Sequence, residues 1–132
     1  MPPFGRVTAP APAPEPPPEP EARLKARLWV QAALRQCGSQ GIFAAVLRHG
    51  DDDAGVVLVK LNRGPAGCEV FTPVRDGAGR PCWLRATGPE PVAESEADAY
   101  LARQRGNDPD LWVIEVEDRD GRLPFLERIL AG

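Results

Sequence analysis

The hydrophobic spacing of this chain changes twice along its length, and these two changes limit the folds it can adopt. Between residues 23 and 37, apolar residues recur at the three- and four-residue intervals of a helix. Near Ile42 short β-branched and apolar runs, bounded by Gly, Asp or Asn, replace this pattern, and near Val92 helical spacing returns. The order predicts one α+β domain built around a single sheet.

The same spacing predicts the individual elements. A first helix is expected to end at a left-handed cap at Gly38, a second to run from Ala93 to Gly106, and a short C-terminal helix to cover Leu123 to Leu130. Short Gly-rich loops separate the first four strands, which favours an antiparallel meander. We therefore expect an antiparallel four- to five-stranded sheet packed by three helices, with strands over residues 42–48, 56–61, 68–74, 82–87 and 111–117.

The first 21 residues contain many prolines and few large apolar side chains. Proline fixes the backbone angle φ and lacks an amide hydrogen, so such a segment favours extended conformations and cannot build a core. We expect residues 1–21 to be a disordered proline-rich tail and residues 22–132 to be a single α+β domain.

Composition narrows the classes of partner and compartment. A net charge of −3 and a pI near 5.2 give no general attraction to nucleic acid or anionic lipid. No stretch approaches the roughly 20 apolar residues of a membrane span, and no secretory signal is visible. Cys37, Cys68 and Cys82 are odd in number and far apart, which indicates buried thiols. A cytoplasmic protein is expected.

The residue types that carry common chemistry are sparse. His49, the only histidine, lies in a turn beside Asp51, Asp52 and Asp53, and neither a catalytic triad nor a zinc-ligand spacing is present. The turn at Asp118–Gly121 has part of a calcium-loop spacing, but Val116 stands where the first ligand would be. We therefore predict no catalytic residue, no metal site and no cofactor.

The leading hypothesis is a non-enzymatic protein-binding or regulatory module. Basic residues outnumber acidic ones over residues 21–89 and the reverse holds over 90–120, a two-signed pattern that favours a protein partner or self-association. The first helix also has an apolar arc wider than one sheet contact needs. The residues expected to form the interaction surface are Arg27, Trp29, Arg35, Trp83 and Arg85.

Two alternatives come from other classes of protein. One is an enzyme whose site combines Asp51 or Asp53 with Arg85 or Arg103 across the sheet, which needs a pocket. The other is a weak nucleic-acid binder that uses the basic residues between Arg23 and Arg85, although Trp83 with Arg85 is the only aromatic–basic pair at a suitable spacing.

Five segments in order resemble a family of short alphaproteobacterial proteins catalogued as domain of unknown function 1491. They are residues 23–30, 50–55, 58–63, 83–91 and 108–113, and the resemblance spans about residues 23–118. The resemblance implies a cytoplasmic bacterial protein. It implies no activity, ligand or site residue, so it supports the domain limits and leaves the function open.

Overall fold

The computed structural model describes residues 25–126 and 129–130, so the expected tail over residues 1–21 lies outside the described residues. Most elements lie within a few residues of their predicted positions. They are α1 (Ala26–Ser39), β2 (Phe43–Arg48), β3 (Val57–Asn62), the short 3-10 helix η2 (Gly64–Ala66), β4 (Cys68–Arg75), β5 (Pro81–Arg85), α2 (Glu94–Asn107), β6 (Trp112–Glu117) and β7 (Ile129–Leu130).

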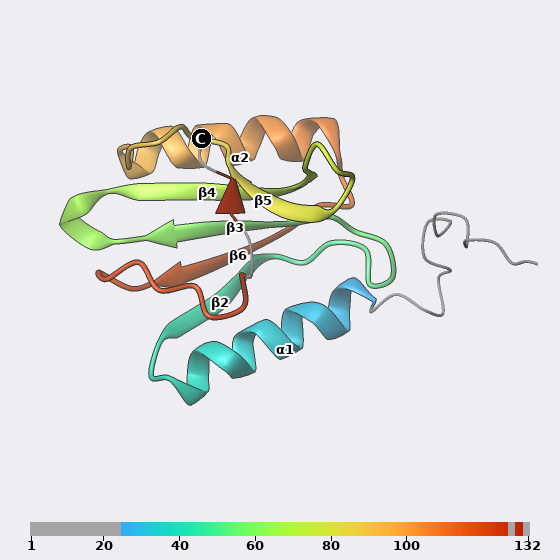
Figure 1. Ribbon diagram of the computed structural model, residues 1–132, viewed down its shortest axis with the longest axis horizontal. Helices are drawn as coiled ribbons and strands as arrows, with labels where there is room; N and C mark the ends of the chain where they lie inside the picture. Colours follow the sequence, from blue (N-terminus) through green and yellow to red (C-terminus); the bar gives the residue numbers. More distant parts are fainter. Residues whose placement is uncertain (1–24, 127–128, 131–132) are drawn as a thin grey trace, which may run out of the picture.

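The sheet is mixed, which corrects the expected antiparallel meander. Its strand order is β2-β6-β3-β4-β5-β7, with β6 inserted between β2 and β3 (Figure 1). β6 runs antiparallel to β2 and parallel to β3, and β7 runs parallel to β5. The meander was wrong because it assumed that β2 and β3, neighbours in sequence, also pair in space.

The two long helices cover opposite faces of the sheet (Figure 1). On the α1 face, Val30, Ala33 and Cys37 pack against Val59, Ile114 and other alternate residues of β3 and β6. On the α2 face, Ala97 and Leu101 pack with Leu58, Val70 and Val113. Because side chains alternate along a strand, β3 contributes to both cores, and its residues 57–61 are all buried.

Two local expectations at the ends of elements were wrong. The predicted C-terminal helix over Leu123–Leu130 is not formed in its described residues, which make a turn near Phe125 and then β7. An edge position beside β5 favours this extended end over a short helix, because it satisfies backbone groups of the sheet. At the first helix, Gly38 stays helical, and Gly41 is the glycine with left-handed φ, at 72°.

The loop between β2 and β3 is bound to the start of β6. The amide of Asp51 donates to the carbonyl of Asp110 at 3.0 Å, and the indole nitrogen of Trp112 donates to the carbonyl of Asp51 at 2.7 Å. A Cβ at Gly50 would collide with the Asp110 carbonyl and the Trp112 ring. Glycine at position 50 therefore lets two backbone segments approach closely.

We expect Gly50→Ala to destabilise the domain by about 2 kcal/mol or more, because the added methyl group forces this loop away from β6. The matched control is Gly38→Ala, where a Cβ meets nothing within 4 Å. That change inside helix α1 should be neutral or should stabilise by up to about 1 kcal/mol. Urea denaturation followed by circular dichroism measures both, and equal effects would contradict the proposed close approach.

Candidate functional site

The two tryptophans of the expected interaction surface meet between α1 and β5. The ring centroids of Trp29 and Trp83 are 5.7 Å apart, and Phe125 packs edge-on against Trp29 at 5.5 Å. Both tryptophans are partly buried against the α1-side core. These aromatic rings therefore hold α1 against β5, and only part of the surface of each tryptophan remains available to another molecule.

Arg85 faces the same side of the sheet and is paired within the domain. Its guanidinium lies over the ring of Phe71 at 5.5 Å, and its Nε is 3.7 Å from Oε1 of Glu69. Glu69 is only 5% exposed, and Arg63 approaches its other oxygen at 3.9 Å. Arg85 thus serves to compensate a buried carboxylate, a contact that sequence spacing did not indicate.

Arg27 and Arg35 lie apart from this cluster, exposed on α1. A shallow hollow of about 150 Å³ lies beside Trp29 and could take one side chain. Its lining contains no charged residue: Trp29, Ala32, Ala33, Gln36, Pro124 and Phe125. The structure therefore brings together Trp29 and Trp83 from the expected set, and leaves Arg27 and Arg35 as separate exposed charges.

The acidic turn after β2 has contacts that explain it without a ligand. The carbonyls of Asp52 and Asp53 accept hydrogen bonds from the amides of Arg27 and Ala26, which begin α1. The Asp51 carboxylate accepts the amides of Asp53 and Ala54. Within residues 25–126 and 129–130, neither Asp51 nor Asp53 forms an ion pair with Arg85 or Arg103; Asp53 pairs with Lys25 instead. The turn caps α1 and satisfies helix amides that would otherwise lack partners.

Other reactive groups are also held in ordinary environments. The ring of His49 is exposed and its Nε2 lies 2.7 Å from a carboxylate oxygen of Asp52. Cys37, Cys68 and Cys82 are free and buried, as expected, and burial raises the pKa of the Cys37 and Cys68 thiols. Both thiols therefore remain protonated near neutral pH and are poor nucleophiles.

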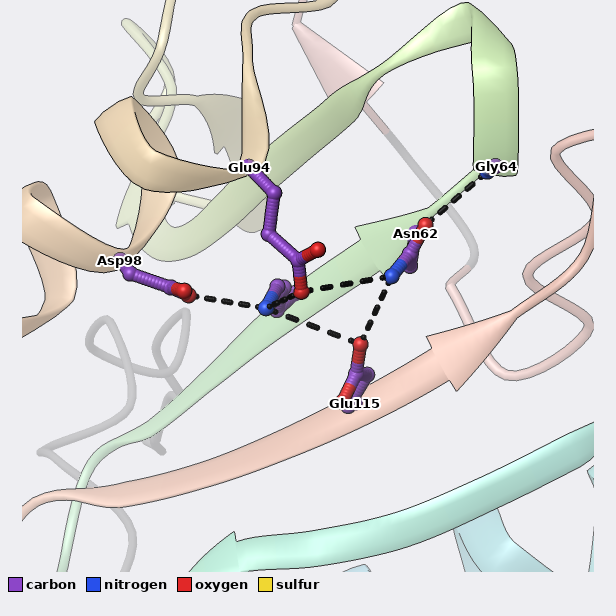
Figure 2. A network of polar contacts seen from close by, with 6 residues as sticks. Asn62, Gly64, Glu94, Asp98 and Glu115 are labelled. Carbon is purple, nitrogen blue, oxygen red and sulfur yellow. Dashed lines mark hydrogen bonds and ion pairs between the residues drawn. The ribbon is translucent and has the colours of Figure 1, made fainter.

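The most elaborate polar arrangement is a network around Lys60, which sequence reasoning did not identify. Lys60 is 3% exposed and lies on the α2 face of β3. Its Nζ is 2.7 Å from Glu94, 2.8 Å from Asp98 and 3.6 Å from Glu115. Figure 2 shows Glu94 and Asp98 extending from α2 toward the sheet, and Glu115 extending from β6, which pairs with β3.

Asn62 extends the network along β3. Its amide nitrogen donates to Glu115 at 3.1 Å and to Glu94 at 3.5 Å, while its oxygen accepts the amide of Gly64 at 2.9 Å (Figure 2). Burial lowers the pKa of Lys60, but hydrogen bonds to Asp98 and Glu94 and the charge of Glu115 outweigh it and raise the pKa overall. The ammonium is thus kept charged, so it acts neither as a base nor as a nucleophile.

A lysine inside the apolar run Val57–Leu61 was the sequence signal for this network. Glu94 and Asp98 are four residues apart and share one face of α2, so they could have been matched to that lysine. The pairing with Glu115 could not have been predicted in this way, because it depends on the insertion of β6.

Among the residues that the structure describes, no group of three His, Cys, Asp or Glu side chains is arranged to hold a metal ion.

Strand β2 lies at one end of the sheet (Figure 1), and several of its apolar side chains are exposed. Phe43 is 59% exposed, Leu47 51% and Val46 39%. A continuous apolar run such as residues 42–48 predicts a strand with both faces largely buried. This prediction is wrong for β2, because it lies at the end of the sheet and the helices leave much of its surface open. Within residues 25–126 and 129–130, no strand pairs with the outer edge of β2.

Comparison with known proteins agrees with the resemblance seen in the sequence. The family model described as protein of unknown function DUF1491 matches residues 24–126. The chain belongs to the DUF1491 family. No curated protein matches it. None of the helices of this DUF1491 protein within the described residues is long and apolar enough to cross a membrane.

Solved structures of similar proteins have the same fold. The crystal structure of a DUF1491 family protein from Caulobacter crescentus CB15 is 39% identical, has a TM-score of 0.73, and the match covers 82% of this chain and 100% of that chain. An NMR structure of a DUF1491 family protein from the same organism is also 39% identical, with a TM-score of 0.69, covering 81% and 96%. The solution structure of Atu0922 from A. tumefaciens is 28% identical, with a TM-score of 0.66, covering 83% and 99%. These organisms agree with the alphaproteobacterial character of the DUF1491 family.

In this DUF1491 protein, we expect Lys60→Met to lower the free energy of unfolding by about 3 kcal/mol, because it removes the buried cation that compensates Glu115 and holds the α2 carboxylates. Lys25→Met is the matched control: Lys25 is half exposed and pairs with Asp53 at 3.4 Å. Its effect should stay within about 0.5 kcal/mol. Chemical denaturation of both variants measures the two losses of unfolding free energy. Comparable losses would show that the Lys60 network adds no more stability than the exposed Lys25 pair.

Proposed function

We propose that this chain is a protein-binding module of the cytoplasm that receives an extended partner segment along the edge of β2. The observation that carries the proposal is the composition and position of that strand. Of the six large apolar side chains exposed in the described part, three belong to β2: Phe43, Val46 and Leu47. Free backbone groups beside apolar side chains are the features by which sheet edges accept an added strand.

The edge also lacks most features that usually prevent such pairing. Residues 43–47 include no proline, no lysine and no acidic residue. Natural edge strands commonly use such residues, short length or bulges to prevent association. β2 has only an irregularity between Val46 and Arg48, where its register with β6 shifts. Its open region is therefore suited to pairing over about five residues.

The charges of the domain support a non-enzymatic role, and its thiols support the cytoplasm as its compartment. The Lys60 ammonium and the Glu69 carboxylate are each compensated internally, so the most buried charges serve stability. Three free, buried cysteines suit a reducing compartment such as the cytoplasm. A non-enzymatic role fits these contacts better than a site built from Asp51 or Asp53.

The surface expected from the sequence stays a second proposal for a binding surface on the same module. Arg27 and Arg35 are exposed on α1, and the hollow beside Trp29, between α1 and the 124–125 turn, could take one apolar side chain. This arrangement suits an acidic partner with one apolar anchor. It carries less weight than β2, because Trp29 and Trp83 already contact each other.

A photo-reactive amino acid placed at Phe43 tests the proposed function in the native cell. We expect it to form covalent adducts with a polypeptide, and we expect Leu47→Lys in the same chain to reduce them about tenfold by placing a charge on the edge. The same group at Val56, which is 42% exposed and lies outside β2, is the control. Adducts no more abundant at Phe43 than at Val56 would refute a binding role for this edge.

A further inference from the structure

The open part of β2 is complementary to itself. When two antiparallel copies of one strand pair around a two-fold axis, each residue faces its counterpart across a shared centre. With Ala45 at that centre, Ala45 of one copy faces Ala45 of the other, and Phe43 of each copy faces Leu47 of the other. The two most exposed apolar side chains of the strand are thereby opposed, and the two small Ala45 residues lie on either side of the axis.

We infer that the occupant of this edge is a second copy of the chain, paired β2 to β2 in an antiparallel dimer centred on Ala45. The inference rests on the proposed function of the edge and names its partner. The dimer joins two six-stranded sheets into one continuous sheet and removes both bare β2 edges.

Charges at the two ends of β2 favour the antiparallel direction. Glu117 is exposed and pairs in register with Phe43 at the beginning of the strand, whereas Arg48 ends it. Antiparallel copies bring the end with Arg48 in one chain to the end with Glu117 in the other. Parallel copies would bring together the two Arg48 side chains, each of which donates to the carbonyl of Pro109, and the antiparallel direction avoids this like-charge contact.

Exposure on both sides of β2 indicates that the helices leave space for the second copy. Val46 pairs with Ile114, whose side chain lies in the α1-side core, yet Val46 is 39% exposed. Phe43 pairs with Glu117 on the α2 face and is 59% exposed. Neither helix therefore covers these positions. The contact uses the outer edge of β2 in each of the two chains, so the assembly closes at two chains.

Sedimentation of the full chain over a wide range of protein concentration tests the dimer. We expect a monomer–dimer equilibrium, and we expect Leu47→Lys to raise the dimer dissociation constant about tenfold or more. Val56→Lys places the same charge at another exposed apolar position outside β2 and should alter the dissociation constant less than about twofold. Circular dichroism confirms that both variants fold. A chain that stays monomeric, assemblies larger than two, or equal effects of the variants would each overturn the inference.

Cysteine cross-linking tests the register. The distance between facing residues of an antiparallel pair suits a disulfide, so Ala45→Cys should link two full-length chains under mild oxidation. Ala78→Cys, exposed in the β4–β5 hairpin, should link far more slowly. Dimers without faster linkage at position 45 would exclude the Ala45-centred pairing. If Phe43 cross-links to a different protein while the chain stays monomeric, the dimer is excluded and the proposed binding function stands.

Discussion

The pairing of β6 between β2 and β3 is the constraint on which the rest of this structure depends. It places the apolar residues Ile114 and Val116 under α1 and Val113 under the α2 side, so that one strand joins both cores. It places Glu115 beside Lys60 through the parallel register of β3 and β6. It also separates β2 from β3 and leaves β2 at the end of the sheet. Stability, the buried charge network and the open edge thus share one cause.

The two helices are attached by different physical means. α1 buries an apolar stripe of Ala26, Val30, Ala33 and Cys37, so the hydrophobic effect dominates its packing. α2 buries only Ala97 and Leu101, and its first turns carry Glu94 and Asp98 to Lys60. Because a buried ammonium is costly without partners, the carboxylates both compensate Lys60 and fix the helix over the sheet. Their position near the N-terminus of α2 is also favoured by the helix dipole.

Local patterns predicted the elements well and their arrangement poorly, for a physical reason. Helical and alternating spacing depends on nearby residues, and it placed α1, α2 and five strands close to their observed bounds. Strand order depends on contacts between distant segments, so the insertion of β6 was missed, and with it the exposure of β2. The short C-terminal helix failed because the pattern of Leu123 to Leu130 fits a turn and a sheet edge as well as one helical face.

The candidate site shows the same division. Trp29 and Trp83 were predicted to belong to an interaction surface; in the structure they contact each other, and that contact holds α1 to β5. Lys60 is visible in the sequence as a lysine inside an apolar run. Its three partners come from two other elements, α2 and β6, so local spacing did not reveal the network.

The composition of β2 is hard to explain as that of a bare edge. Water must hydrate the exposed rings and branched side chains of Phe43, Val46 and Leu47, at a cost that polar substitutions would remove without disturbing a core. The bulge before Arg48 limits regular pairing to a short span, in which backbone hydrogen bonds alone give a weak contact. Apolar side chains at both ends of that span supply the additional burial that a short pairing needs. These features support the proposal that another polypeptide pairs with the outer edge of β2.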